Sequence, residues 1–165
     1  MNAETAQQKS KSNQQKIRSK TLLSLWLRLL ACESIVEQQL RTKLRESFSI
    51  TLPQFDVLAE LERFDKPLSM TELSKNLMVS NGNVTGVVDR LVKENFVKRI
   101  PSEYDKRVYL IELTENGKIA FDDISTQHEQ WIRDMFEDMT LNDIDMMLKL
   151  LTKTYIQLKQ NRENY

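Results

Sequence analysis

Apolar residues recur along most of the chain at the three- and four-residue spacing of helices, and only two short stretches alternate as strands do. The first periodic segment, residues 20–47, contains no glycine or proline and repeats Leu22, Leu29 and Val36 at intervals of seven. This pattern predicts one long helix. Similar patterns predict five more helices, at about residues 51–64, 69–77, 80–91, 114–139 and 140–160.

Polar residues mark the starts of three of these helices. Thr51 with Gln54, and Ser69 with Glu72, have the spacing of a capping box, in which side chains and backbone N–H groups bond reciprocally. Ser80 is a favourable N-cap for the helix that follows them. The two helices that begin at Ser69 and Ser80 are therefore short and closely linked.

Two β-type runs come next, at about residues 96–100 and 107–113, with a turn-forming segment between them. Three helices followed by a two-stranded hairpin are typical of a winged helix-turn-helix. The last predicted helix carries apolar residues in alternating steps of three and four, the pattern of a coiled-coil seam: Leu141, Ile144, Leu148, Leu151, Tyr155 and Leu158. The expected fold is mainly α, with a small β-hairpin wing.

The composition narrows the functional classes. The chain has 165 residues, of which 40% are hydrophobic, and Cys32 and His128 are its single cysteine and histidine. These counts exclude an internal disulfide and a zinc site built on paired cysteines or histidines. We find no nucleophile paired with a base and no glycine-rich phosphate loop, so we expect no enzyme, no metal and no cofactor. No membrane span or signal peptide is expected either, which predicts a cytoplasmic protein.

Charge is unevenly distributed although 24 basic residues balance 24 acidic ones. Residues 1–20 contain five basic residues against Glu4 and almost no apolar ones, so we expect a flexible basic arm there. Residues 112–145 contain ten acidic residues against two basic ones. Because electrostatic fields act over a Debye length of about 8–10 Å, a neutral total does not exclude a nucleic-acid partner.

Two features of the predicted winged helix-turn-helix indicate DNA binding. Small and amide side chains occupy the first turns of its third helix, where asparagine can bond to adenine and glycine allows close approach. Two adjacent cations occupy the hairpin tip, where we expect Asp105 to hold the Arg107 guanidinium and direct it into a minor groove. The candidate DNA-binding residues are Ser80, Asn81, Gly82, Asn83, Thr85 and Arg90 in the helix, and Ser102, Asp105, Lys106 and Arg107 in the hairpin.

The chain resembles the MarR family of bacterial regulators in four segments, which are Leu52–Phe55, Met70–Ser74, Asn83–Leu91 and Asp105–Gly117. The resemblance covers residues 21 to about 160. It implies a homodimer whose first and last helices intertwine, with one recognition helix per subunit in the major groove and wing arginines in flanking minor grooves. It also implies repression that a small ligand relieves. On this basis residues 21–165 form one domain, with the winged helix-turn-helix at about 51–116 and dimerisation helices at about 21–50 and 117–160.

Residues 79–86 and 26–30 are also similar to a narrower branch of the family, which controls the breakdown of hydroxycinnamates and related aromatic acids. That branch senses the acid or its coenzyme A thioester. We expect the ligand pocket where the first helix meets the DNA-binding lobe. The residues assigned to it supply an aromatic face, hydroxyl partners and cations for the acid: Arg18, Trp26, Arg28, Leu30, Ser34, His128 and Trp131.

Two alternatives remain open at this stage. Cys32 could sense oxidation, as in another branch of the family, although its apolar neighbours Leu29, Leu30 and Ile35 favour a packing role. The winged helix could also serve as a protein-interaction module that does not bind DNA. The sequence leaves open the operator, the target genes, the effector and the choice between repression and activation.

Overall fold

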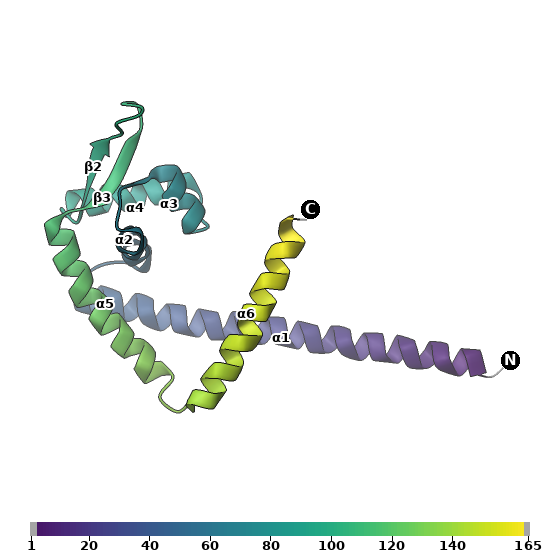
Figure 1. Ribbon diagram of the computed structural model, residues 1–165. Helices are drawn as coiled ribbons and strands as arrows, with labels where there is room; N and C mark the ends of the chain where they lie inside the picture. Colours follow the sequence, from purple (N-terminus) through teal and green to yellow (C-terminus); the bar gives the residue numbers. More distant parts are fainter. Residues whose placement is uncertain (1–2, 164–165) are drawn as a thin grey trace. The chain divides into compact units, whose positions relative to one another are not determined.

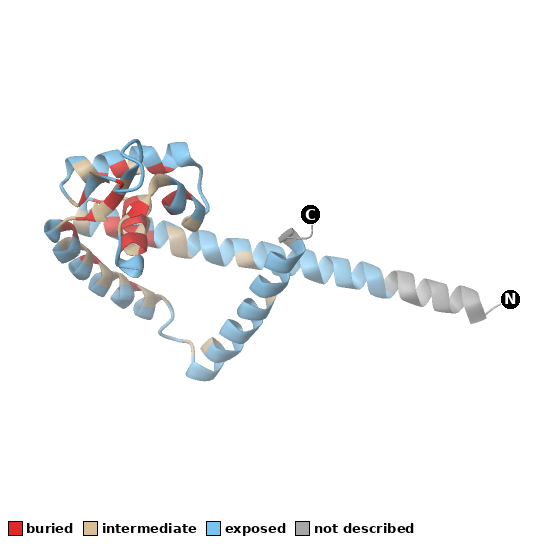
Figure 2. Ribbon diagram, turned by 45° about the horizontal axis from the view of Figure 1, so that its top comes forward, coloured by how far each residue is buried: buried red, intermediate tan, exposed pale blue. Residues whose placement is uncertain are grey.

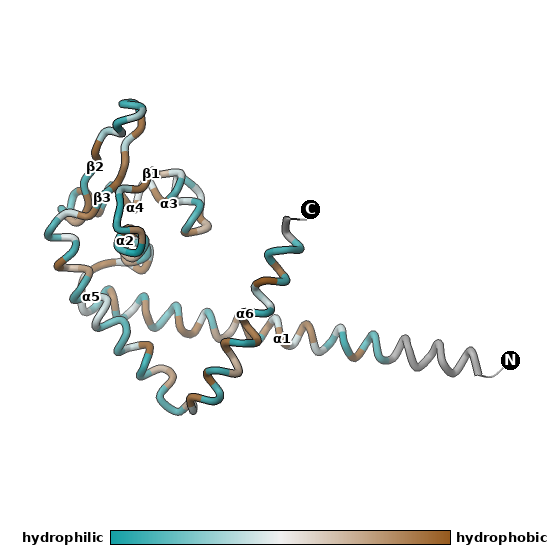
Figure 3. Tube along the Cα trace, viewed as in Figure 1, coloured by the Kyte–Doolittle hydropathy of each residue, from teal (hydrophilic) through white to brown (hydrophobic). Residues whose placement is uncertain are grey.

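The computed structural model describes residues 3–163, with the side chains of residues 14–161. The chain divides into two compact units, Met1–His128 and Glu129–Tyr165, which are described separately here. Figure 1 labels the helices and the two longer strands, and Figure 3 also labels β1. No helix of the described residues has the length and apolarity to cross a membrane. The elements are α1 (Ala3–Phe48), α2 (Leu52–Phe64), β1 (Leu68–Ser69), α3 (Met70–Asn76), α4 (Asn81–Lys93), β2 (Val97–Pro101), β3 (Tyr109–Leu113), α5 (Glu115–Met135) and α6 (Leu141–Glu163).

Helix α1 is longer than expected. It runs without interruption for 46 residues from Ala3, which corrects the prediction of a helix start near Lys20. Residues 3–20 of the expected flexible arm are helical, and residues 1 and 2 lie outside the described part of the chain. Glutamine and lysine, which are frequent in residues 3–20, have high helix propensity. Extending an existing helix also avoids the cost of a new nucleus. A polar composition alone therefore did not distinguish a solvated helix from a coil.

The predicted helix starts in the DNA-binding lobe are confirmed. Gln54 Oε1 accepts hydrogen bonds from the Thr51 N–H at 3.0 Å and the Thr51 hydroxyl at 2.9 Å. Glu72 Oε2 accepts from the Ser69 N–H at 2.8 Å, and the Ser69 hydroxyl accepts from the Glu72 N–H at 3.2 Å. The Ser80 hydroxyl accepts from the backbone N–H three residues later at 3.4 Å, so the start of α4 is fixed locally.

Three strands form the wing sheet, in the order β1-β3-β2 with antiparallel pairing throughout. The two longer strands are the expected hairpin, with Val97 opposite Leu113. Strand β1 was not predicted, because its two residues are too few to show alternation. It pairs Leu68 with Ile111 and so ties the turn before α3 to the hairpin.

The core of the first unit lies where the lobe helices meet the sheet, and Figure 2 shows it in red. Its members come from α2, α3, α4 and all three strands: Val57, Leu58, Leu61, Leu68, Leu73, Val84, Val88, Leu91, Val97, Ile111 and Leu113. Burial of one face of α4 leaves its polar face toward solvent. The core therefore determines which side chains the lobe presents to a partner.

Gly117 has a packing role at the start of α5. A Cβ built on this residue would lie 1.9 Å from the Phe96 carbonyl oxygen, which no side chain tolerates. The Gly117 N–H donates to the Thr114 hydroxyl at 2.9 Å, and that hydroxyl donates to the Asn95 carbonyl at 2.7 Å. This contact joins α5 closely to the end of the helix-turn-helix.

Helix α5 ends at Met135 rather than near Met139, because short turns replace the helical bonds after Arg133. Helix α6 then begins as expected, with Thr140 accepting from the Asp143 N–H at 3.2 Å. Hydrophobic positions are spread along α6 and the middle of α1 in Figure 3. Most of them are exposed in the single chain, as Leu141 is at 83%.

Candidate nucleic-acid interface and ligand cavity

The polar face of α4 is the first part of the candidate interface. Asn81, Asn83, Thr85 and Arg90 are exposed, whereas the Val88 side chain on the opposite face is completely buried. The Thr85 hydroxyl donates to the Asn81 carbonyl within the helix at 2.9 Å. Because Asn81 and Asn83 are exposed in the first turns of α4, their amides lie where a recognition helix contacts base edges.

Gly82 and Gly86 have no packing role against the residues that the structure describes. A Cβ at either position would meet nothing within 4 Å, and neither residue has a positive φ. Each glycine still costs about 1 kcal/mol relative to alanine in a helix interior. Both positions are therefore open to close approach by an external partner, in contrast to Gly117.

The hairpin tip is the second part of the interface. Lys106 and Arg107 are exposed at the end of the wing, which Figure 1 shows extending beyond β2 and β3. Asp105 Oδ1 accepts from the Arg107 backbone N–H at 2.9 Å, which differs from the expected pairing with the guanidinium. The carboxylate therefore shapes the turn and leaves the guanidinium free of it.

Two other residues of the tip differ from the sequence analysis. Ser102 is buried, with 9% of its surface exposed, and its hydroxyl accepts from the Tyr104 N–H at 3.3 Å. This hydrogen bond gives Ser102 a role in the turn, and its contact with DNA stays a prediction. Tyr104 is fully exposed and was overlooked, although an aromatic residue in a polar hairpin tip is a signal for a contact.

Two polar contacts fix α4 relative to its neighbours. Arg99 Nη2 of β2 donates to Asp89 Oδ1 and joins the wing to the recognition helix. Because both side chains are exposed, this ion pair contributes at most about 1 kcal/mol. Buried Gln54 donates through Nε2 to Glu94 Oε2 at 2.8 Å, which ties the start of α2 to the end of α4.

A cavity of about 420 Å³ lies between α1, α2 and the start of α4, at the junction where we expected a pocket. Its apolar walls come from α2, from the end of the short helix α3 and from α4, and three charged residues join them. The residues that line it are Glu37, Arg41, Leu52, Pro53, Asp56, Val57, Leu77, Val79, Asn83, Val84 and Val87. Its volume lies in the range of small-molecule sites.

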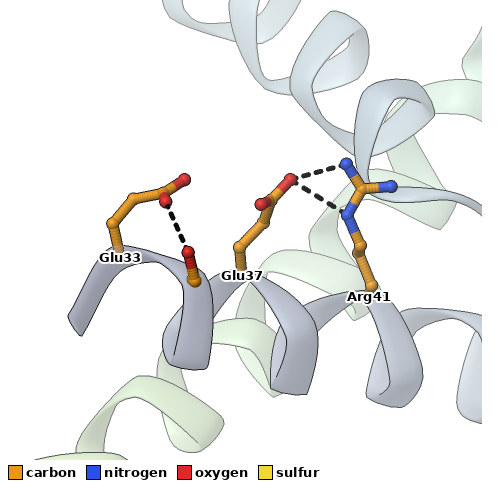
Figure 4. A network of polar contacts seen from close by, with 4 residues as sticks. Glu33, Glu37 and Arg41 are labelled. Atoms are coloured by element: carbon orange, nitrogen blue, oxygen red, sulfur yellow. Dashed lines mark hydrogen bonds and ion pairs between the residues drawn. The ribbon is translucent and has the colours of Figure 1, made fainter. Parts of the chain in front are cut away.

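The three charged residues of this cavity differ in their partners. Figure 4 shows Arg41 and Glu37 joined across one turn of α1, with Arg41 Nε donating to Glu37 Oε1 at 2.9 Å. Burial raises the pKa of the Asp56 carboxyl to about 6, with Arg41 opposing the rise and Glu37 adding to it. The cavity therefore contains two carboxyl groups and one guanidinium, and Glu37 already engages that guanidinium.

The residues that the sequence analysis assigned to a ligand do not line this cavity. Those on α1 are exposed along its outer part: Arg18, Trp26, Arg28, Leu30 and Ser34. The His128 ring stacks on Phe55 with ring centroids 4.5 Å apart, and Trp131 is buried. Cys32 is exposed, which differs from the packing role that its neighbours suggested.

The charged residues of the cavity were missed, although the sequence contained a signal for them. Glu37 and Arg41 have the spacing of a helical ion pair, and Asp56 interrupts an otherwise apolar face beside Phe55. Among the described residues, no group of three or more histidine, cysteine, aspartate or glutamate side chains could hold a metal ion.

A packed lobe that exposes an amide-rich helix and a basic hairpin defines a DNA-binding winged helix-turn-helix protein. More narrowly, the chain belongs to the MarR family of transcriptional regulators. Residues 50–109 match the MarR family model. The HTH-type transcriptional regulator YsmB of Bacillus subtilis is 30% identical over 77% of this chain and 86% of its own length. The family and the fold inferred from sequence are thereby confirmed, and the chain is a regulator rather than an enzyme.

Two further similarities bear on function. The transcriptional activatory protein BadR of Rhodopseudomonas palustris is 27% identical over 82% of this chain and 79% of its own length. The crystal structure of a mutant MarR from E. coli, complexed with operator DNA, is 29% identical, with a TM-score of 0.66. It covers 76% of this chain and 92% of that chain.

The glycines of α4 lead to a first prediction. Gly86→Ala is expected to raise the free energy of unfolding by up to about 1 kcal/mol and to weaken operator binding, because the added methyl separates the helix from DNA. Gly117→Ala should instead lower the free energy of unfolding by about 1–3 kcal/mol, because its Cβ meets backbone. Urea denaturation and gel shift on an operator fragment selected from random DNA measure the two effects. Unchanged DNA affinity in Gly86→Ala would contradict a close approach of the α4 backbone to DNA.

Asp56 leads to a prediction on pH. The folded-state pKa of about 6 exceeds the usual aspartate pKa of 3.8. The penalty for folding with an ionised Asp56 is therefore complete above about pH 6 and absent below about pH 4. Asp56→Asn should therefore melt at a higher temperature than the wild type at pH 7.5 and at the same temperature at pH 3.5. Thermal melts followed by circular dichroism across this range test the prediction. Exposed Glu62→Gln on the same helix is the control, with no pH-dependent difference expected.

Proposed function

We propose that this MarR-family regulator is a homodimeric repressor that a small aromatic acid or its coenzyme A thioester releases from a palindromic operator. The observation that supports a dimer is the exposed apolar surface of the long helices α1 and α6. Leu22, Trp26 and Leu30 are exposed on α1, and Leu148 and Leu151 on α6. Monomeric soluble proteins rarely leave so much apolar surface uncovered, and a second copy would cover it symmetrically.

A hollow in the second unit supports the same proposal. It measures about 500 Å³ and is lined almost entirely by apolar side chains from the end of α5, the turn after it and the start of α6: Ile132, Arg133, Phe136, Met139, Ile144, Met147, Leu148 and Leu151. Side chains of a partner helix would fill such a hollow. The periodicity of three and four on α6 suits helix packing of this kind.

The operator follows from the dimer. Two identical recognition helices read two half-sites whose centres lie about one helical turn, or a multiple of one, apart, so the operator should be a pseudo-palindrome. The E. coli MarR structure with operator DNA supports this mode of binding for the present chain. Repression is the direct result when a dimer covers a promoter. Because BadR is named an activatory protein, a reporter assay with and without the regulator must test whether this chain represses or activates transcription.

The effector proposal depends on the similarity of residues 26–30 and 79–86 to the branch that senses aromatic acids. Exposed Trp26 and Leu30 offer an apolar face to a ring, and Arg18 or Arg28 offers a cation to the acid. We also retain Ser34, His128 and Trp131 as candidates for this site. These positions remain a proposal for the assembled dimer.

The DNA contacts are predicted to be of two kinds. Arg107→Ala removes a wing cation and should weaken binding to every duplex. If Arg107 contacts phosphate, the slope of affinity against salt concentration should fall by about one unit. Asn83→Ala should weaken operator binding by about 1–3 kcal/mol and leave random DNA unaffected. Gel shifts at several salt concentrations separate the two kinds. A protein-interaction module would show neither effect, and that result would exclude DNA recognition by this face.

The dimer is predicted to depend on α6. Replacing both Leu148 and Leu151 with aspartate puts charge where apolar contact is needed, so the dimer should dissociate and operator binding should be lost. Light scattering measures the mass, and circular dichroism checks that the chain stays helical. Lys149→Asp, on the same helix between them, is the control for added charge. A dimer that persists after the double replacement would contradict the prediction that these residues of α6 form the dimer contact.

The effector is predicted to release the operator. Adding p-coumarate, ferulate, benzoate or their coenzyme A thioesters should weaken operator affinity roughly 5- to 150-fold, because the ligand favours the released state. Gel shift and tryptophan fluorescence follow release and binding together. A parallel assay with peroxide tests oxidation of exposed Cys32 as the alternative signal. If only peroxide released the operator, the signal that this regulator senses would be an oxidant and not an aromatic acid.

A further inference from the structure

Tyr104 lies at the tip of the wing and is 100% exposed. It belongs to the seven residues between β2 and β3, and turns of this kind favour glycine, asparagine, aspartate and serine over aromatic residues. The Tyr104 N–H donates to the Ser102 hydroxyl at 3.3 Å, but any residue other than proline would supply that N–H. The fold therefore uses the backbone of Tyr104 and gives its ring no packing role among the described residues.

The loop that carries this ring is ordered by hydrogen bonds at both of its ends. The Ser102 N–H donates to the Val108 carbonyl at 2.8 Å, and the Val108 N–H donates to the Asp105 carbonyl at 2.9 Å. The Asp105 carboxylate also accepts from the Arg107 N–H at 2.9 Å. Because the loop is already ordered, a partner that covers the Tyr104 ring has little loop entropy to remove.

The surroundings of the ring combine apolar surface with positive charge. Val108 and Tyr109, at the start of β3, are exposed at 40% and 54% and extend the apolar surface along the hairpin. Lys106 and Arg107 are exposed beside it, and neither forms an ion pair with a residue that the structure describes. The DNA backbone has matching chemistry, since its phosphates are anionic and its deoxyribose groups offer apolar surface.

We propose that the Tyr104 ring packs against deoxyribose groups in the wall of the minor groove that flanks the operator half-site, beside Arg107. This inference rests on the proposed contact of the wing with DNA, and it does not depend on the effector or on the direction of regulation. It adds an uncharged, apolar contact to an interface that otherwise consists of amides and cations.

The minor groove suits both side chains of the tip. With α4 as the recognition helix in the major groove, the hairpin beside it meets the adjacent backbone and minor groove. This groove is about 6 Å wide in B-DNA, so a flat ring can enter it edge-on. Apolar side chains are inserted into minor grooves by other DNA-binding proteins, and a narrow groove attracts arginine by its negative potential. Tyr104 and Arg107, three residues apart, would therefore occupy neighbouring places.

A ring contact has a signature that a cation lacks. Contact of a cation with phosphate releases counterions, so its contribution to affinity falls as the salt concentration rises. Packing of a neutral ring against sugar releases none. The contribution of Tyr104 should therefore be the same at every salt concentration, whereas that of a phosphate-bound Arg107 should not.

Fluorescence anisotropy with the full-length protein and a labelled operator fragment, selected from random DNA, tests the inference at several salt concentrations. Tyr104→Ala should weaken binding roughly 5- to 30-fold at each of them, the effect of partly burying one aromatic ring. Tyr104→Phe keeps the ring and should stay within about threefold of the wild type. Glu103→Gln is the control beside it. It removes an acid and no apolar surface, so it should strengthen binding, and most at low salt.

A shortened duplex locates the contact. Removing the base pairs outside the two half-sites removes the flanking minor grooves, so wild type and Tyr104→Ala should then bind within about twofold of each other. Circular dichroism and the melting temperature should be unchanged in Tyr104→Ala, because the replaced side chain is fully exposed. If they do change, Tyr104→Ser, which suits a turn, takes its place.

Four results would overturn the inference. They are unchanged operator affinity in Tyr104→Ala, a loss that disappears at high salt, an equal loss on the shortened duplex, and a loss in Tyr104→Phe as large as in Tyr104→Ala. If Arg107→Ala still weakens binding in such a case, the wing contacts DNA and only the ring contact is wrong. If Arg107→Ala has no effect either, the proposed contact of the wing with DNA is wrong as well.

Discussion

Burial of one face of α4 is the constraint from which the functional surface follows. Val84, Val88 and Leu91 fill the core between the helices and the wing sheet. Once they are buried, the helical repeat places Asn81, Asn83 and Arg90 toward solvent, where DNA can be read. The wing is fixed to the same core through Val97 and Ile111, so the two parts of the interface share one support.

Sequence patterns predicted much of this lobe because its signals are local. A capping residue and its partner lie three positions apart, so Ser69 and Glu72 could be identified without knowledge of the fold. The faces of α4 followed from the periodicity of its valines for the same reason. Strand β1 could not be predicted, because two residues become a strand only by pairing with Ile111, far along the chain. The helical start of α1 was missed because composition does not separate a solvated helix from a coil.

The ligand cavity shows a different limit of sequence reasoning. A stripe on a single helix, such as Trp26 with Leu30, can be seen in the sequence, whereas a pocket is made where several helices meet. The meeting of α1 with α2 brings Arg41 and Asp56 together, although they lie on different helices. A cavity does lie at the expected junction, because its place depends on the architecture, whereas the residues that line it depend on packing. Candidate ligand residues from one helix face are therefore starting points, and interhelical geometry selects among them.

The glycines on the exposed face of α4 also have an evolutionary consequence. Gly82 and Gly86 stand in open space, so alanine at either position would fit the free protein and make the helix more favourable. Under the proposed close approach to DNA, alanine at these two positions would exchange operator affinity for stability. Selection for heat tolerance and selection for operator recognition would then act in opposite directions at these two codons, and lineages in hot habitats would gain stability elsewhere in the fold.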